Sequence, residues 1–163
     1  LSPPFRTVTE IADLADLTSK DWQPQDVLVQ GDWKIMLTDR GDLWTLNNGV
    51  ESLAKAVSQI ELSPDEEKVA VLNYHNEINI IAETPEKDMA LPALEGVVSQ
   101  LKWYRDGAHL IALTDSRLQL IEVTETSPLV TSLATGTQQF VYDPDDNVLY
   151  FADQKGIWKI NFT

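Results

Sequence analysis

The 163-residue chain contains no cysteine and has few basic residues. Without cysteine there is no disulfide framework, no thiolate nucleophile and no sulfur ligand for a metal. Lysine and arginine together number 12 against 26 acidic residues, which gives a formal net charge of −14. Such a charge repels a phosphate backbone, so we expect no nucleic-acid partner.

Long apolar runs are also missing. No stretch approaches the roughly 18 residues that suggest a membrane span, so this segment is not expected to insert into a membrane. The sequence shows no signal-peptide pattern, and it starts at Leu1 instead of methionine. We therefore expect a processed product or an excised domain.

Catalytic and metal-binding motifs are absent as well. There is no GxSxG and no phosphate-binding loop, and the seven glycines stand singly. His75 and His109 have no second histidine or cysteine at ligand spacing. The run 143–147 is rich in carboxylates, but it lacks the glycine and distal glutamate of an EF-hand loop. The sequence therefore predicts no cofactor, no metal site and no enzymatic activity.

What the chain does contain is a fourfold repeat. In each copy an apolar anchor is followed five residues later by an aspartate, and then by a continuous apolar run. The anchors are Val27, Ile60, Leu101 and Phe140, and the aspartates are Asp32, Asp65, Asp106 and Asp145. The anchors lie 33, 41 and 39 residues apart, near the ~40–45 residues of a propeller blade.

Each copy predicts an antiparallel meander of short strands. The second strands are the apolar runs Ile35–Leu37, Val69–Leu72, Leu110–Leu113 and Val148–Phe151, and the third strands begin at Leu43, Ile78, Leu118 and Ile157. Continuous apolar strands are typical of sheets that are buried on both faces. Outer fourth strands are expected around Leu53, Leu94 and Leu133. The fold class is thus an all-β propeller segment of four four-stranded blades.

The expected organisation is an N-terminal segment, 1–26, followed by four blades at 27–57, 58–98, 99–137 and 138–163. In the N-terminal segment, residues 5–8 could form a strand. Residues 9–18 have helical spacing of apolar residues, with Thr9 as the N-cap. The last blade has no fourth strand of its own, so we expect residues 5–8 to pair with its third strand.

Two copies of the repeat resemble a known family. Ser63-Pro64-Asp65 before the apolar run at 68–72, and the stretch from Trp103 to Leu113, are similar to the WD-like repeat of TolB-type bacterial β-propellers. The similarity extends over residues 27–162. No copy matches fully, because Glu66 follows Asp65 where the family has glycine. The resemblance implies a binding platform, usually in the bacterial cell envelope. Similar repeats also occur in PEGA-type envelope proteins.

The preferred function is therefore a non-enzymatic protein-interaction or scaffold module, extracytoplasmic and bacterial, that binds a protein or peptide. Two alternatives stay open at this point. One is an accessory or gating propeller of a larger hydrolase, such as a serine peptidase. The other is a propeller that is catalytic in its own right.

Propeller topology also predicts where a partner binds. The first-to-second strand turns share one face, which is strongly acidic here, whereas the second-to-third turns share the other. Arginine and tyrosine are favoured in interfaces. The expected partner-binding residues on this second face are Arg40, Tyr74, His75, Arg117 and Lys155, and Gln59, Gln100 and Gln139 are assigned to the same face.

Ring closure can occur in three ways. The four blades could close a ring within one chain, at the small end of the known ~4–8 blades. Two chains could instead form a homodimeric ring of eight blades with two-fold symmetry. The third option is an excerpt of a larger ring. The aromatic residues Trp103 and Tyr142 leave little room near the axis of a four-bladed ring, which favours the last two options.

Overall fold

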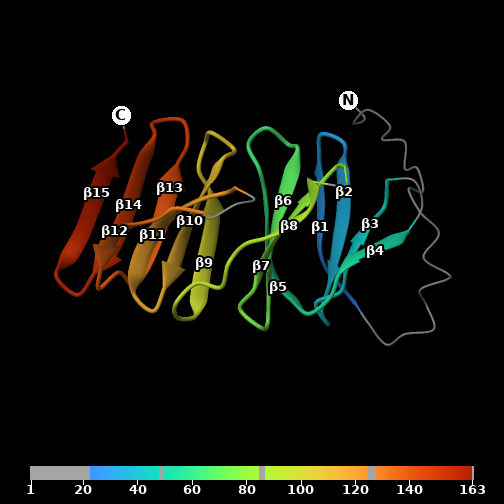
Figure 1. Ribbon diagram of the computed structural model, residues 1–163, viewed down its shortest axis with the longest axis horizontal. Helices are drawn as coiled ribbons and strands as arrows, with labels where there is room; N and C mark the ends of the chain where they lie inside the picture. The colour runs from blue at the N-terminus through green and yellow to red at the C-terminus, as the bar shows by residue number, and fades with distance from the viewer. Residues whose placement is uncertain (1–22, 48–49, 85–86, 125–127, 163) are drawn as a thin grey trace, which may run out of the picture. The chain divides into compact units, whose positions relative to one another are not determined.

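The computed structural model describes residues 23–47, 50–84, 87–124 and 128–162. Their regular structure is antiparallel β-sheet, in four sheets of sequential strands (Figure 1). Three sheets have four described strands, in the orders β1-β2-β3-β4, β5-β6-β7-β8 and β12-β11-β10-β9, and the fourth has three, β13-β14-β15. The expected all-β propeller segment is confirmed.

The strands have the following bounds: β1 Pro24–Gln30, β2 Trp33–Thr38, β3 Leu43–Thr45, β4 Glu51–Ala54, β5 Val57–Leu62, β6 Lys68–Asn73, β7 Ile78–Ala82, β8 Met89–Ala90, β9 Val98–Trp103, β10 His109–Thr114, β11 Arg117–Glu122, β12 Val130–Thr135, β13 Gln139–Asp143, β14 Val148–Asp153 and β15 Gly156–Asn161. The chain divides into two compact units, Leu1–Lys55 and Ala56–Thr163, which are described separately below.

The first unit contains the sheet β1–β4. Its second strand is buried almost throughout, as the apolar run predicts. The Arg40-Gly41-Asp42 tripeptide forms the turn between β2 and β3, where the Gly41 N–H donates to the Thr38 carbonyl at 2.9 Å. Gly41 has a φ of 77°, a conformation that costs glycine little and other residues more. This glycine is therefore explained by the turn.

The second unit contains the other three sheets, stacked as consecutive blades. One apolar cluster joins the sheet β5–β8 to the sheet β9–β12, and includes Leu72, Ile80, Leu101, Trp103 and Leu110. A second cluster joins β9–β12 to β13–β15 around Ile111, Leu118, Phe140 and Leu149. The middle strands β6 and β10 are buried because each contributes side chains to both of its faces.

The last two blades are also joined by aromatic rings. The ring centroid of Tyr104 lies 5.4 Å from that of Tyr142 and 5.0 Å from that of Phe162. Burial raises the pKa of the Tyr142 hydroxyl, although a hydrogen bond with the Arg105 backbone acts in the opposite direction. The hydroxyl therefore stays protonated at neutral pH, and it donates to Asn147 Oδ1 at 2.9 Å.

One expected strand is misplaced. The fourth strand of the second sheet is β8, Met89–Ala90, and it ends before Leu94. Ladder bonding continues only to Leu91, whose N–H donates to the Ile78 carbonyl at 2.9 Å. Pro92 follows and has no N–H to extend the ladder. Leu94 instead packs, partly buried, against the apolar cluster between the two blades.

Several expectations are not tested by the structure. The strand at 5–8 and the helix at 9–18 lie outside the described residues, so the closing strand stays a prediction, as do the boundaries of the N-terminal segment and the blades. In the described part of the chain, no helix is long and apolar enough to cross a membrane.

Candidate functional site

Within the second unit, the second-to-third strand turns and the connections between blades lie at one end of the sheets. Asn76, in the β6–β7 turn, donates from Nδ2 to the Gly96 carbonyl at 2.8 Å and accepts from the Val98 N–H at 2.6 Å. Ser116, in the β10–β11 turn, accepts from the Thr137 N–H at 2.9 Å. We call this end the turn face; it also includes Gln154 and Lys155 between β14 and β15.

A groove crosses the turn face between the last two blades. It consists of two adjoining hollows with volumes of about 340 Å³ and 430 Å³ that share Ser116 and Gln138. The first is lined by Ser116, Thr135, Gly136, Gln138, Asp153, Gln154 and Lys155. The second is lined by Val97, Ser99, Leu113, Asp115, Ser116, Thr137 and Gln138. We call these residues together the blade groove.

The β10–β11 turn gives the blade groove a fixed wall. Asp115 and Ser116 have φ values of 43° and 68°, as in the two-residue turns that suit a twisted hairpin. The Asp115 N–H donates to the Val97 carbonyl at 3.2 Å, and Asp115 Oδ1 accepts from the Val97 N–H at 3.1 Å. The turn is thus tied to the connection that precedes β9.

The β14–β15 turn forms the opposite wall. Asp153 Oδ1 accepts from the N–H groups of Lys155 and Gly156 at 2.7 and 2.9 Å. Hydrogen bonds lower the pKa of Asp153 below its ordinary value. The bond with the Trp158 side chain has the largest effect, and the bond with the Lys155 N–H has the next largest. The carboxylate is therefore ionised at neutral pH, and the exposed Lys155 lines the same hollow.

The predicted partner-binding residues lie in different settings. Lys155 lines the blade groove. Arg117 is engaged at its edge, where Nη1 lies 2.9 Å from Glu95 Oε2 and Nη2 donates to the Glu95 carbonyl at 2.7 Å. Tyr74 and His75 are exposed in the β6–β7 turn. Arg40 is exposed in the first unit and is described only there.

The assignment of Gln59 and Gln100 to an open binding face is wrong. Both side chains are directed between blades: Gln59 Nε2 donates to the Leu101 carbonyl and Gln100 Nε2 to the Phe140 carbonyl, each at 2.8 Å. Sequence reasoning also missed Ser116, Gln138 and Gln154 as groove residues. The two-residue turn at 115–116 was the available signal, because such a turn places its side chains at the end of a hairpin.

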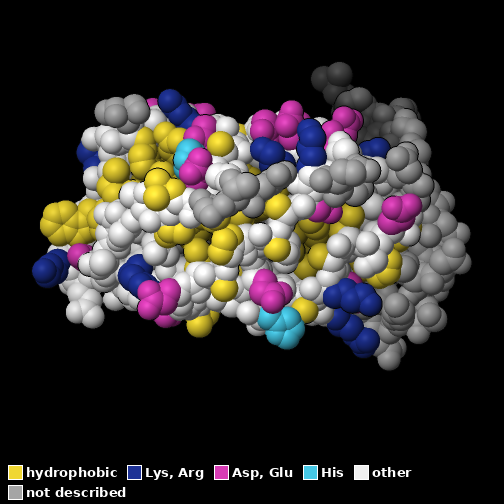
Figure 2. Space-filling view, in the orientation of Figure 1, with side chains coloured by type: hydrophobic (Ala, Val, Ile, Leu, Met, Phe, Trp, Pro, Cys, Tyr) yellow, Lys and Arg dark blue, Asp and Glu magenta, His cyan; other side chains and the backbone are white. Residues whose placement is uncertain are grey.

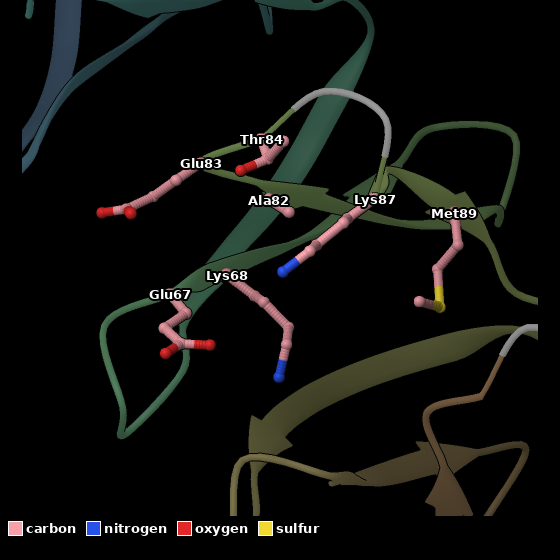
Figure 3. A pocket seen from close by; sticks show the side chains of 7 residues that line it. All are labelled: Glu67, Lys68, Ala82, Glu83, Thr84, Lys87 and Met89. Atoms are coloured by element: carbon pink, nitrogen blue, oxygen red, sulfur yellow. The ribbon is translucent and has the colours of Figure 1, made fainter.

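Another hollow, of about 330 Å³, lies at the opposite end of the sheet β5–β8. Lys68 and Lys87 both line it; the Lys87 amine points toward the middle of the lining residues, whereas the Lys68 side chain extends away from Ala82 and Thr84 (Figure 3). The Lys68 ammonium group is already engaged, however. It donates to the Gly107 carbonyl at 2.9 Å and lies 3.5 Å from Asp65 Oδ2. This hollow is therefore the weaker candidate for a ligand.

His109 and the acidic turn at 143–147 have structural partners. His109 Nδ1 lies 2.7 Å from Asp106 Oδ2. Asp143 Oδ1 accepts from the N–H groups of Asp145 and Asp146 at 3.0 and 3.2 Å. Among the residues that the structure describes, no group of three or more histidine, aspartate or glutamate side chains is arranged to hold a metal ion.

No protein-family model and no curated protein matches the chain. Solved structures do match. A gluconolactonase from Xanthomonas campestris is 14% identical, with a TM-score of 0.56 over 83% of this chain and 56% of its own. The dihydro-heme d1 dehydrogenase NirN, in complex with DHE, is 16% identical, with a TM-score of 0.59 over 81% of this chain and 32% of its own.

A third similar structure is KlAtg21 in complex with the coiled coil of AgAtg16. It is 11% identical, with a TM-score of 0.66 over 86% of this chain and 53% of its own. At such low identity these similarities show the propeller fold alone. The chain spans between a third and somewhat more than half of the length of these proteins.

The comparisons correct one prediction, namely that the chain is not an enzyme. That prediction rested on missing motifs. Two of the solved structures with this fold are a gluconolactonase and a dehydrogenase, so a propeller can be an enzyme. The absence of nucleophile and phosphate-binding motifs therefore does not exclude activity in a propeller. The comparisons do not confirm membership of the TolB or PEGA families.

Proposed function

We propose that the second unit is an interaction module that binds a protein or peptide partner in the blade groove. The observation that carries this proposal is the pair of adjoining hollows between the last two blades, which share Ser116 and Gln138. Two open hollows that share lining residues suit an extended segment of a partner chain better than a compact small molecule.

The walls of the blade groove favour binding because they are held in place before a partner arrives. Asp115 is bonded to Val97 on one wall, and Asp153 is bonded to the β14–β15 turn on the other. At the edge, Arg117 pairs with the Glu95 carboxylate and donates to the Glu95 carbonyl. A preorganised surface loses less conformational entropy on binding, which raises affinity.

The chemistry of the blade groove suits a peptide segment. Ser116, Gln138 and Gln154 provide donors and acceptors for backbone amide groups. The exposed Lys155 can pair with a carboxylate, and the exposed side chain of Val97 offers an apolar contact. The partner that fits best is an extended, largely polar segment.

Two further points support this proposal. KlAtg21, which shares the fold, is described in complex with a coiled coil, so a fold of this kind can present a surface to a protein segment. The resemblance of the repeat to TolB-type propellers also favours a binding platform in the bacterial envelope. We include that location in the proposal.

The proposal can be tested with a random peptide library displayed on phage. The purified chain is used to select binders, and the affinity of a synthetic selected peptide is measured by calorimetry. The double variant Gln138→Ala/Lys155→Glu should weaken binding by roughly tenfold or more, because it removes a hydrogen-bonding side chain and reverses a charge.

The matched control reverses charges on the opposite face. Asp145→Lys/Asp146→Lys changes two exposed turn residues of the same sheet, and the affinity for the selected peptide should stay within about twofold of wild type. If the control weakens binding and the groove variant does not, the blade groove is not the binding surface.

A further inference from the structure

Thr137 carries a buried hydroxyl group that has no hydrogen-bond partner. The residue lies in the connection between β12 and β13, where its own N–H donates to the Ser116 carbonyl at 2.9 Å and the Gln138 N–H donates to the Ala152 carbonyl at 2.8 Å. Thr137 is 1% exposed, and its Oγ1 finds no partner among the residues that the structure describes. Such a group is unfavourable, because folding removes its bonds to water and replaces none of them.

The packing of the blades does not require this hydroxyl. Thr137 stands three residues before the anchor of its sheet, and the same position in the two preceding sheets of the unit holds a valine. These valines, Val57 and Val98, are buried as Thr137 is, at 1% and 6% exposure. Valine and threonine differ only in that a methyl group replaces the hydroxyl. An apolar side chain is therefore sufficient at this position, and packing does not account for the hydroxyl of Thr137.

The position of Thr137 differs from that of the two valines in one respect, because it lines the blade groove. It belongs to the hollow of about 430 Å³, together with Ser99, Leu113 and Asp115. Ser99 Oγ donates to the Leu113 carbonyl at 3.2 Å, and Asp115 Oδ1 accepts from the Val97 N–H at 3.1 Å. The polar side chains beside Thr137 thus already have partners, whereas its own hydroxyl has none.

We infer that Thr137 recognises the backbone of a peptide bound in the blade groove, by donating from Oγ1 to a peptide carbonyl oxygen in the 430 Å³ hollow. The inference rests on the proposed function and names the group that the groove binds. In the free protein Oγ1 has almost no contact with solvent. The bond therefore forms after rotation about χ1 to another staggered position, which turns the hydroxyl toward the hollow that the side chain lines.

The charges near this hollow favour a neutral acceptor. Asp115 lines the hollow, and its carboxylate repels a negatively charged group of a ligand. Both basic and acidic side chains lie at the turn face of the sheets β9–β12 and β13–β15, which is their lower end in the view (Figure 2). These surroundings do not select a strongly charged ligand. A peptide carbonyl is uncharged and accepts a hydrogen bond from a hydroxyl.

Thr137→Val tests the inference, because it should affect stability and binding differently. The substitution keeps the shape of the side chain and removes the hydroxyl. The Tm of the free chain should stay the same or rise, since a buried polar group without a partner is lost. The affinity for a peptide selected on the wild-type chain, measured by calorimetry, should fall roughly three- to tenfold, as expected for one hydrogen bond. Thr137→Ser retains the hydroxyl and should bind within about twofold of wild type.

The matched control introduces a hydroxyl at the equivalent position of another sheet. Val57→Thr lies in β5, outside the blade groove. It should lower the Tm, because it buries a hydroxyl that has no assigned partner. Its affinity for the selected peptide should stay within about twofold of wild type. A loss of affinity in Val57→Thr equal to that in Thr137→Val would show that the effect is not local to the groove, which overturns the inference.

The peptide carbonyl is identified by replacing the amides of the selected peptide one at a time with thioamides, whose sulfur is a weaker acceptor than oxygen. At one position the replacement should weaken binding to the wild-type chain. It should have little further effect on binding to Thr137→Val, because both changes remove the same hydrogen bond. Losses that add independently at every position overturn the assignment of a carbonyl acceptor.

The remaining outcomes separate this inference from the proposed function. Wild-type affinity in Thr137→Val, together with weaker binding by Gln138→Ala/Lys155→Glu, overturns the inference and leaves the proposed function intact. Wild-type affinity in both variants, or failure to select any peptide, overturns both. A Tm of Thr137→Val below that of wild type also overturns the inference, because the hydroxyl then has a partner within the fold.

Discussion

Gln100 makes two hydrogen bonds with the backbone of Phe140, 40 residues later in the chain. Its Nε2 donates to the Phe140 carbonyl at 2.8 Å and its Oε1 accepts from the Phe140 N–H at 3.1 Å. One side chain thus satisfies both polar backbone groups of a residue that is itself 1% exposed. The contact fixes the register of one blade against the next.

Replacing Gln100 by leucine should therefore destabilise the protein. Leucine keeps most of the side-chain volume but leaves the N–H and carbonyl of Phe140 without these partners. We expect the free energy of unfolding to fall by about 2 kcal/mol, within the ~1–3 kcal/mol of an unsatisfied buried polar group. Urea denaturation measures it, and Gln154→Leu in an exposed turn should change it by less than ~0.5 kcal/mol. Equal effects of the two variants would contradict this role of Gln100.

The pKa of Asp65 predicts how the free energy of unfolding changes in acid. Burial alone raises the pKa of this carboxyl, but hydrogen bonds from Ser63 and from the Glu67 N–H, together with the charge of Lys68, lower it below its ordinary value. A lowered pKa in the folded state means that the ionised Asp65 stabilises the fold above the unfolded pKa of about 3.9. This contribution is lost as the pH falls through the folded pKa.

Asp65→Asn should consequently lose less stability than wild type when the pH is lowered from about 5 to about 3. The measurement is urea denaturation at several pH values in that interval. Ser63→Ala removes one of the hydrogen bonds that lower the pKa, so it should give an intermediate pH dependence. Parallel curves for Asp65→Asn and wild type would show that Asp65 makes no such contribution.

Alanine substitutions at Gly96 and Gly136 distinguish the cost of a positive φ from the cost of a steric collision. Both have positive φ values, 95° and 74°, which cost an alanine about 1 kcal/mol or more. A Cβ at Gly96 would also collide with the Asp115 carboxylate, whereas at Gly136 it would meet nothing within 4 Å. Gly96→Ala should therefore lower the free energy of unfolding by at least ~1 kcal/mol more than Gly136→Ala. Thermal and urea denaturation of both variants compare them directly; equal losses would contradict the collision.

Local patterns in the sequence were sufficient to predict the sheets. An apolar anchor, a turn aspartate and an apolar run follow at short, constant offsets, and each second strand lies where its apolar run does. The exception is Leu94, where Pro92 ends the ladder early. Hairpins are local structures, so nearby residues contain enough information to place them.

The contacts between blades could not be predicted in this way. Gln59 and Gln100 bond to backbone carbonyls about 40 residues away. Every residue has a backbone carbonyl, so the residue types do not identify which one accepts the bond. The blade groove also depends on segments that are distant in the sequence, because it forms where the turn containing Ser116 meets the connection containing Gln138. Lys155 was predicted from its turn, but Ser116 and Thr135, which line the groove with it, come from another blade.

Hydrogen exchange with and without a selected peptide tests the central claim, that the blade groove is the binding surface, most directly. The peptide should slow the exchange of backbone amides at 115–117, 135–138 and 153–155, because these segments form the walls of the groove. Amides of the opposite turns, at 65–67 and 145–147, should exchange at unchanged rates. Protection at the opposite turns, with none at Ser116, Gln138 and Lys155, would contradict the proposed site.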